Sequence, residues 1–144
     1  MEINQKNTNE LLNHIHTSGS GYDLLRYVCL PDLLGRDANS ILYVMGKNLA
    51  RNVKVQTIDD LKNFFVKTGW GNLILLKEKR RELIFELTGD AISKRSQLDI
   101  TIDYRLEAGF LAESIQLIKD CPCECVEESN KKKQLTQFNV MYTK

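Results

Sequence analysis

The feature that most constrains the fold of this chain is a run of small residues within an apolar helix. The sequence predicts a helix from Tyr104 to about Lys119, and its first half carries Ala108, Gly109 and Ala112. Small residues let the backbone of another element approach closely. We therefore expect this helix to lie clamped between two layers of the molecule rather than on the surface of one.

Three further helices are expected in the first half of the chain. The periodicity of apolar residues predicts them at 22–30, from 37 or 39 to about 52, and from 57 to 68. Pro31 disfavours continuation of the first helix through Leu30. Gly46 lies in the middle of the second, where it costs about 1 kcal/mol relative to alanine, which suggests that another element crosses there at close range. Thr57 and Asp60 resemble a capping box at the start of the third.

The remaining segments alternate between apolar and polar residues and predict strands. They lie at 72–77, 82–88, 98–103, 122–128 and 135–142, and residues 89–97 form a connector or a short helix. This order predicts an α+β fold, with N-terminal helices packed on one face of an antiparallel sheet of four to five strands. A chain of 144 residues is one domain of ordinary size. We expect a flexible or weakly helical segment over residues 1–20 and a single α+β domain over 21–144.

Charge and composition exclude several classes of function. The formal net charge is +1, so nucleic acid is not expected as a partner, and the basic run 131–133 is interpreted as a solvated turn. No apolar run approaches the roughly 18–20 residues that a membrane span needs, and the N-terminus does not resemble a signal peptide. We therefore expect a cytoplasmic protein. The only histidines are His14 and His16, so the body of the domain has no histidine as general base, and an enzyme is not expected.

The eye-catching motif near the C-terminus is a run of alternating cysteines. Cys121, Cys123 and Cys125 would share one face of an extended strand and are candidate metal ligands. A straight strand would space their sulfurs about 6.5–7 Å apart, which is too far for one tetrahedral ion. The alternative is that the thiols form the apolar face of a half-buried strand. We favour that alternative and expect neither a metal nor another cofactor.

A second candidate lies on the helix that ends near residue 52. Tyr43, Lys47 and Arg51 follow one another at intervals of four and form a basic stripe. In one interpretation the stripe binds an anionic head group. In the other it is a solvated helix face, or a dimer contact in which it pairs with acids such as Glu107 or Glu113. Glu107 is expected to pair with Lys47 or Arg51 across the helix packing.

Several segments, in this order and spacing, resemble a small family of bacterial proteins, the YslB-like family. They are 30–35, 42–43 together with 46–51, 69–71, 82–89 and 106–117. The resemblance extends more distantly to 4-vinyl reductase-type domains, the Bet-three-like subunits of TRAPP tethering complexes and haem-NO-binding domains. It implies the ligand-binding-domain fold of the NO-signalling and Golgi-transport type, binding of a small hydrophobic ligand and a homodimer formed through N-terminal helices. Haem does not fit, because the haem-binding relatives need a proximal histidine.

From the residues and this resemblance together, we expect a non-enzymatic sensor or carrier that binds a small apolar ligand between helices and sheet. The residues expected near the ligand are Tyr43, Met45, Gly46, Trp70 and Phe110. The alternative is a protein-interaction or scaffold module with a filled core and no ligand. The two hypotheses differ in whether the fold encloses an apolar cavity.

Overall fold

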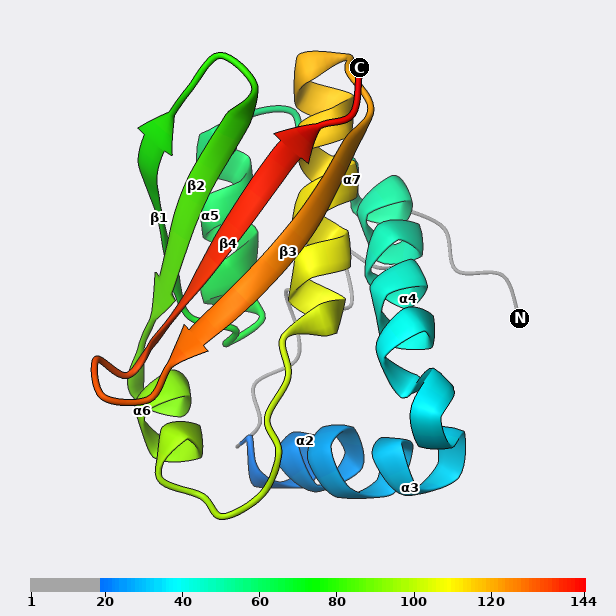
Figure 1. Ribbon diagram of the computed structural model, residues 1–144, viewed down its shortest axis with the longest axis vertical. Coiled ribbons are helices and arrows are strands. Elements are labelled where there is room, and N and C mark those ends of the chain that lie inside the picture. Colours follow the sequence, from blue (N-terminus) through cyan, green and yellow to red (C-terminus); the bar gives the residue numbers. More distant parts are fainter. Residues whose placement is uncertain (1–18) are drawn as a thin grey trace.

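The computed structural model describes residues 19–144, which form helices packed against one antiparallel sheet (Figure 1). In chain order the elements are α2 (Ser20–Leu24), the π-helical turn η1 (Leu25–Cys29), α3 (Leu30–Leu34), the 3₁₀ turn η2 (Gly35–Asp37), α4 (Ala38–Val53), α5 (Ile58–Lys67), β1 (Asn72–Glu78), β2 (Glu82–Thr88), α6 (Asp90–Ser96), α7 (Arg105–Lys119), β3 (Cys123–Asn130) and β4 (Leu135–Tyr142). The expected α+β fold is confirmed. The part of the N-terminal segment before residue 19, with His14 and His16, lies outside the described residues.

The sheet has four strands in the order β1-β2-β4-β3, and every neighbouring pair is antiparallel. Helices α5 and α7 lie behind one face of the sheet, and α4 packs against α7 on the side of β3 (Figure 1). The core lies between this face and the helices. Leu83, Phe85 and Leu87 of β2 point into it together with Phe138 and Val140 of β4. None of the helices within residues 19–144 has the length and apolar character needed to cross a membrane.

Helices α4 and α7 are in backbone contact at two glycines. A Cβ atom added to Gly46 would lie 2.0 Å from the carbonyl oxygen of Leu106, and one added to Gly109 would lie 2.0 Å from the carbonyl oxygen of Tyr43. Side chains larger than hydrogen are therefore excluded at both positions. The close crossing predicted from Gly46 and from the small residues of 106–113 is confirmed.

Helix α5 begins as its sequence predicts. Thr57 is its N-cap, and the Thr57 Oγ1 atom accepts a hydrogen bond of 3.0 Å from the backbone N–H of Asp60. The buried side of this helix carries Leu61, Phe64 and Phe65 into the core. The capped start fixes where α5 lies against the β1 side of the sheet.

Two of the sequence predictions are wrong: the end of the first helix and the strand at residues 98–103. Pro31 does not end the first helix, because helical backbone runs from Ser20 through Leu34 and Pro31 follows the π-helical turn Leu25–Cys29, where the regular α-helical hydrogen-bond pattern is already interrupted. Residues 98–103 do not form a strand. Leu98 and Ile100 are exposed in an irregular connector, and the Asp103 carboxylate accepts a hydrogen bond from the backbone N–H of Arg105 at the start of α7.

A candidate ligand cavity beside a buried charge cluster

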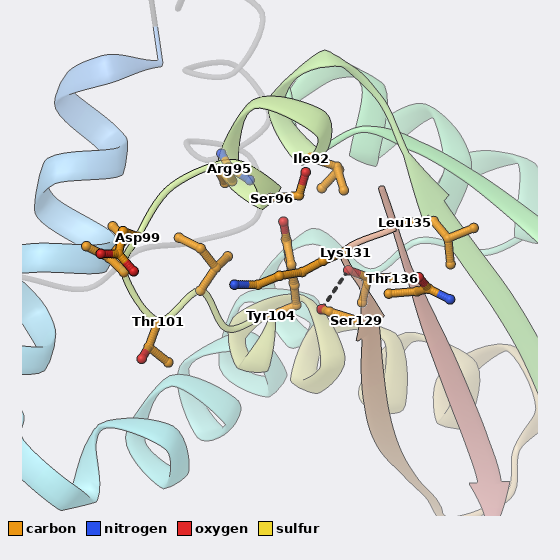
Figure 2. A pocket seen from close by; sticks show the side chains of 13 residues that line it. Ile92, Arg95, Ser96, Asp99, Thr101, Tyr104, Ser129, Lys131, Leu135 and Thr136 are labelled. Atoms are coloured by element: carbon orange, nitrogen blue, oxygen red, sulfur yellow. Dashed lines mark hydrogen bonds between the residues drawn. The ribbon is translucent and has the colours of Figure 1, made fainter. Parts of the chain in front are cut away.

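A cavity of about 410 Å³ lies between α6, the connector 97–104 and the end of the β3–β4 hairpin (Figure 2). Its aliphatic wall is formed by Ile92 of α6, Ile100 and Ile102 of the connector and Leu135 at the start of β4. These side chains come from segments far apart in the sequence, so the cavity exists only in the folded domain. The fold therefore offers a partly open pocket with an aliphatic wall at the end of the sheet.

The rest of the cavity wall is polar. Arg95, Tyr104 and Lys131 contribute side chains to it, and Asp99 supplies a carboxylate. The Tyr104 side chain extends from the start of α7 toward α6 (Figure 2). Burial raises the pKa of Tyr104, and hydrogen bonding to Arg95 offsets part of that rise. Tyr104 is therefore a neutral phenol at physiological pH, able to donate or accept a hydrogen bond at the cavity wall.

Arg95 is the most deeply buried charged group of this wall, with an exposed fraction of 5%. Its Nε and Nη2 atoms donate hydrogen bonds of 3.2 and 2.9 Å to the same oxygen, Oδ1 of Asp23 in α2. Burial alone would lower the pKa of Arg95, but this hydrogen-bonded carboxylate helps raise it above its ordinary value. The guanidinium therefore stays charged and fixed against the N-terminal helices.

Beside Arg95 lies a second buried arginine, Arg26 of η1, with an exposed fraction of 1%. Its Nη2 atom lies 3.0 Å from Oε1 of Glu107 and 3.0 Å from Oδ1 of Asp103. Its Nη1 atom donates a hydrogen bond of 2.9 Å to the hydroxyl of Tyr22. Buried charges are stable only when they are paired in this way. The expected pairing of Glu107 with Lys47 or Arg51 is therefore wrong, because its carboxylate bonds Arg26.

Tyr27 lies between the two arginines. The guanidinium carbons of Arg26 and Arg95 lie 5.1 and 5.2 Å from the centroid of its ring, within the range of cation–π contacts. The Tyr27 hydroxyl and the Arg26 Nε atom are buried and have no hydrogen-bond partner within residues 19–144. We name the residues Asp23, Arg26, Tyr27, Arg95, Asp103 and Glu107 the buried charge cluster. The cluster meets the cavity at Arg95.

The five residues expected near a ligand do not converge on this cavity, and none of them lines it. Trp70 and Phe110 pack in the core with their ring centroids 5.5 Å apart, so Trp70 is a hydrophobic plug at its helix-to-strand corner. Gly46 lies beneath α7, and the side chain of Met45 is 44% exposed. The Tyr43 hydroxyl donates a hydrogen bond to Oε2 of Glu124 and accepts one from a backbone N–H of β3.

The basic stripe of α4 is bound to acids of the same chain. Lys47 Nζ lies 2.9 Å from Oε1 of Glu124 in β3, and Arg51 Nη2 lies 3.2 Å from Oε1 of Glu113 in α7. These pairs hold α4 against the edge of the sheet and against α7. Within the described part of the chain, the stripe therefore contributes to packing between elements.

The cysteines of β3 face the core. Cys123 and Cys125 are buried, while Cys121 is partly exposed before the strand begins. Burial raises the pKa of Cys123 to about 11 and raises that of Cys125 well above its ordinary value, so both are neutral thiols at neutral pH. No group of three or more histidine, cysteine, aspartate or glutamate side chains within residues 19–144 is arranged to hold a metal ion.

With this geometry in place, comparison with known proteins identifies the family. Residues 19–141 match the family described as "Protein of unknown function (DUF2507)". The chain belongs to this family. It is 40% identical over 121 residues to the uncharacterized protein YslB of Bacillus subtilis (strain 168), covering 84% of this chain and 82% of that protein. It is 26% identical over 107 residues to the uncharacterized protein MJ1642 of Methanocaldococcus jannaschii, covering 74% of this chain and 65% of that protein.

The fold of this DUF2507 protein is also found in a solved structure. A crystal structure of a vinyl-4-reductase family protein from Methanocaldococcus jannaschii superimposes with a TM-score of 0.71, covering 97% of this chain and 90% of that chain at 19% identity. At that identity the likeness shows the fold alone. The resemblance to the YslB-like family and to 4-vinyl reductase-type domains is confirmed by these matches.

Sequence reasoning missed the residues that build the cavity and the buried charge cluster of this DUF2507 protein. Tyr104 and Arg95 belong to segments expected to be a helix start and a connector, so neither was expected at a cavity. One signal was available for Arg26, which stands between Leu25 and Tyr27 in a helix otherwise rich in apolar residues. A lone arginine in such a context indicates a buried ion pair, although its partners could not be named.

Proposed function

We propose that this protein is a non-enzymatic binding domain for a small molecule with an apolar body and an oxygen-bearing polar end. The observation that supports it is the cavity of about 410 Å³, a volume within the usual range of small-molecule sites. Its aliphatic wall fits the apolar body, and Arg95 and Tyr104, which both carry hydrogen-bond donors, line the same cavity as partners for the polar end. Ligand sites commonly combine an apolar lining with a few fixed polar groups in this way.

The chemistry of the cavity wall supports binding rather than catalysis. Its hydroxyl groups include Ser129 and Thr136, which lie 3.0 Å apart and bond each other (Figure 2). Among residues 19–144 no histidine side chain contributes to the cavity, and histidine is the most common general base near neutral pH. An activated nucleophile needs such a base within hydrogen-bond reach. The arrangement therefore favours a sensor or carrier over an enzyme.

The proposal is tested by titrating the purified protein with decanoate, a probe with an apolar chain and a carboxylate, in a calorimeter. We expect saturable binding, because the chain fits the aliphatic wall. Ile100→Trp should abolish this binding by filling the cavity. Leu98→Trp is the matched control, since Leu98 lies two residues away with a similar exposed fraction, 44% against 43%, and does not line the cavity.

Two results would refute the proposal. One is the absence of binding to the unaltered protein, and the other is equal binding by the unaltered protein and Ile100→Trp. Native mass spectrometry before and after organic extraction provides an independent measurement. An extractable mass that copurifies with the unaltered protein and is missing from Ile100→Trp would identify the class of the natural ligand.

A second candidate function is self-association through the N-terminal helices. Leu24, Leu25, Val28 and Leu33 are all at least half exposed on the helices that run from residue 20 to residue 34. Exposed apolar groups that gather in this way often mark protein interfaces. We propose that they form a homodimer contact. Sedimentation equilibrium should show a dimer that Leu33→Glu dissociates and that a control substitution on the exposed sheet face, Ile74→Glu, leaves intact.

A further inference from the structure

From the buried charge cluster we infer that occupancy of the cavity is coupled to docking of the N-terminal helical segment, Ser20–Leu34. This inference rests on the proposed function, because it concerns the regulation of the same cavity. The helical segment would then respond to the ligand and would not only cover the domain. Ligand binding should fasten the segment to the domain, and release of the segment should weaken ligand binding.

The segment is held by few contacts. Arg26 and Tyr27 are its only buried residues, and both belong to the buried charge cluster. Tyr22 and Asp23, which also contact the cluster, are partly buried. A segment with so few buried apolar contacts belongs to the part of a protein that opens most easily. Its docking therefore depends on how well the cluster is assembled.

The other half of the cluster belongs to the elements that form the cavity. Arg95, which bonds Asp23, lies on α6 and lines the cavity. Asp103, which bonds Arg26, stands between Ile102 and Tyr104, and both of those residues line the cavity. The same short elements therefore carry the cavity wall and the acceptor and donor groups that hold the segment.

This shared position provides the coupling. A ligand packed against the connector and α6 would restrict the motion of Asp103 and Arg95, so the segment would then dock onto groups that are already ordered. The two events must favour each other equally, because a coupling free energy between two sites is reciprocal. Within residues 19–144 the Tyr27 hydroxyl and the Arg26 Nε atom have no hydrogen-bond partner, so these residues alone do not fully satisfy the cluster, which keeps docking sensitive to small changes.

Hydrogen exchange of the unaltered protein tests the coupling directly. With saturating decanoate, we expect the backbone amides of residues 20–34 to exchange at least about five-fold more slowly than without it, the lower end of typical coupling. Exchange that stays unchanged would overturn the inference. Faster exchange would also overturn it, because it would mean that the decanoate carboxylate displaces Asp23 from Arg95.

The reciprocal test uses a variant outside the cavity. Asp23→Asn weakens the contact between the segment and Arg95, and we expect it to lower decanoate affinity about five-fold or more. Asp32→Asn is the matched control, since Asp32 lies on the same segment, is exposed and has no ion pair within residues 19–144; it should bind as the unaltered protein does.

The outcomes separate the two proposals. If Ile100→Trp abolishes binding while Asp23→Asn binds as tightly as the unaltered protein, the cavity hypothesis stands and the coupling is wrong. If the unaltered protein does not bind decanoate, both fail. The exchange experiment needs no substitution, so a variant that folds poorly does not leave the coupling without a test.

Discussion

Gly46→Ala should destabilise this protein strongly, although replacing glycine by alanine inside an ordinary helix stabilises that helix. Alanine is favoured over glycine by about 1 kcal/mol in a helix interior. At Gly46, however, the added Cβ would lie 2.0 Å from the Leu106 carbonyl oxygen and 2.8 Å from the Phe110 backbone nitrogen. Ordinary contacts of this kind begin near 3.4 Å. Because both obstacles are backbone atoms of a packed helix, α4 and α7 would have to move apart.

The cost follows from that movement. Overpacking a tight site costs about 1–3 kcal/mol or more. A gap of 0.5–1 Å already removes a quarter to a half of the dispersion energy between the atoms it separates. The helix-propensity gain offsets only about 1 kcal/mol of these losses. We expect the free energy of unfolding to fall by about 3 kcal/mol and the melting temperature to fall by about 12 °C, at roughly 4 °C per kcal/mol for a domain of this size.

Urea unfolding followed by the fluorescence of Trp70, the only tryptophan in the sequence, measures the change. Gly21→Ala is the control, because Gly21 is also helical but an added Cβ would meet no atom of residues 19–144 within 4 Å. That variant should be as stable as the unaltered protein or more stable by up to about 1 kcal/mol. If Gly46→Ala matched Gly21→Ala in urea midpoint, the account of the helix crossing would be wrong.

Three further predictions concern charge and protonation. Glu107→Gln leaves the buried Arg26 with less countercharge and should cost about 3 kcal/mol in urea unfolding; an unchanged midpoint would contradict the ion pair. A thiol reagent at pH 8 should modify the exposed Cys29 but not Cys125, whose pKa is raised by burial; peptide mass mapping detects the difference, and rapid labelling of Cys125 in the folded protein would contradict it. Burial tends to raise the pKa of Glu124, but its hydrogen bonds and nearby cations lower it overall. A lowered carboxyl pKa stabilises the fold above the ordinary pKa, and this contribution is lost as the pH falls through the folded-state value. Between about pH 6 and pH 3, a range that spans the ordinary carboxyl pKa and values below it, the urea midpoint should therefore fall less for Glu124→Gln than for the unaltered protein, and equal falls would contradict the assignment.

The parts of the fold that could be predicted are those with local signals. Thr57 and Asp60 are three residues apart, and the cap they form depends on nothing else in the chain. The alternation of Leu83, Phe85 and Leu87 likewise identifies the buried face of β2 without knowledge of its neighbours. Gly46 in the middle of α4 lowers the helix propensity relative to alanine, and this unfavourable choice alone indicated that another element approaches α4 closely there. Each of these inferences needed only a short stretch of sequence.

The connector before α7 shows why such local signals can fail. Residues 98–103 alternate between apolar and polar as a strand would. The connector carries the chain from α6 to α7 past the end of the β3–β4 hairpin, so it does not run along the free edge of β1 or of β3 and pairs with neither strand. Asp103 uses its carboxylate at the start of α7 and on Arg26 instead. Periodicity indicates which side chains share a face, but pairing with another strand is decided by the whole fold.

The buried charge cluster could not be predicted from the sequence, for a different reason. Charged residues are rarely buried, and although the apolar context of Arg26 indicates a buried ion pair, the sequence does not identify Glu107 as its partner. These two residues are 81 positions apart, and only the packing of η1 against α7 reveals that they meet. The cavity is equally hard to predict from the sequence, because Arg95, which lines it, belongs to the same cluster of distant residues. Sequence reasoning therefore found the family and the fold, but the residues that it named for a ligand do not line the cavity.

The start of α7 is where these constraints meet, and this decides how the proposals should be tested. Asp103 and Glu107 hold Arg26, Tyr104 lines the cavity, and Gly109 lies against α4. A substitution at any of these positions would change stability, docking and the cavity together, so a loss of ligand binding there would not identify its cause. Ile100 on the exposed connector touches the cavity without joining the helix crossing or the charge cluster. Substitutions at Ile100 can therefore separate ligand binding from the integrity of the fold.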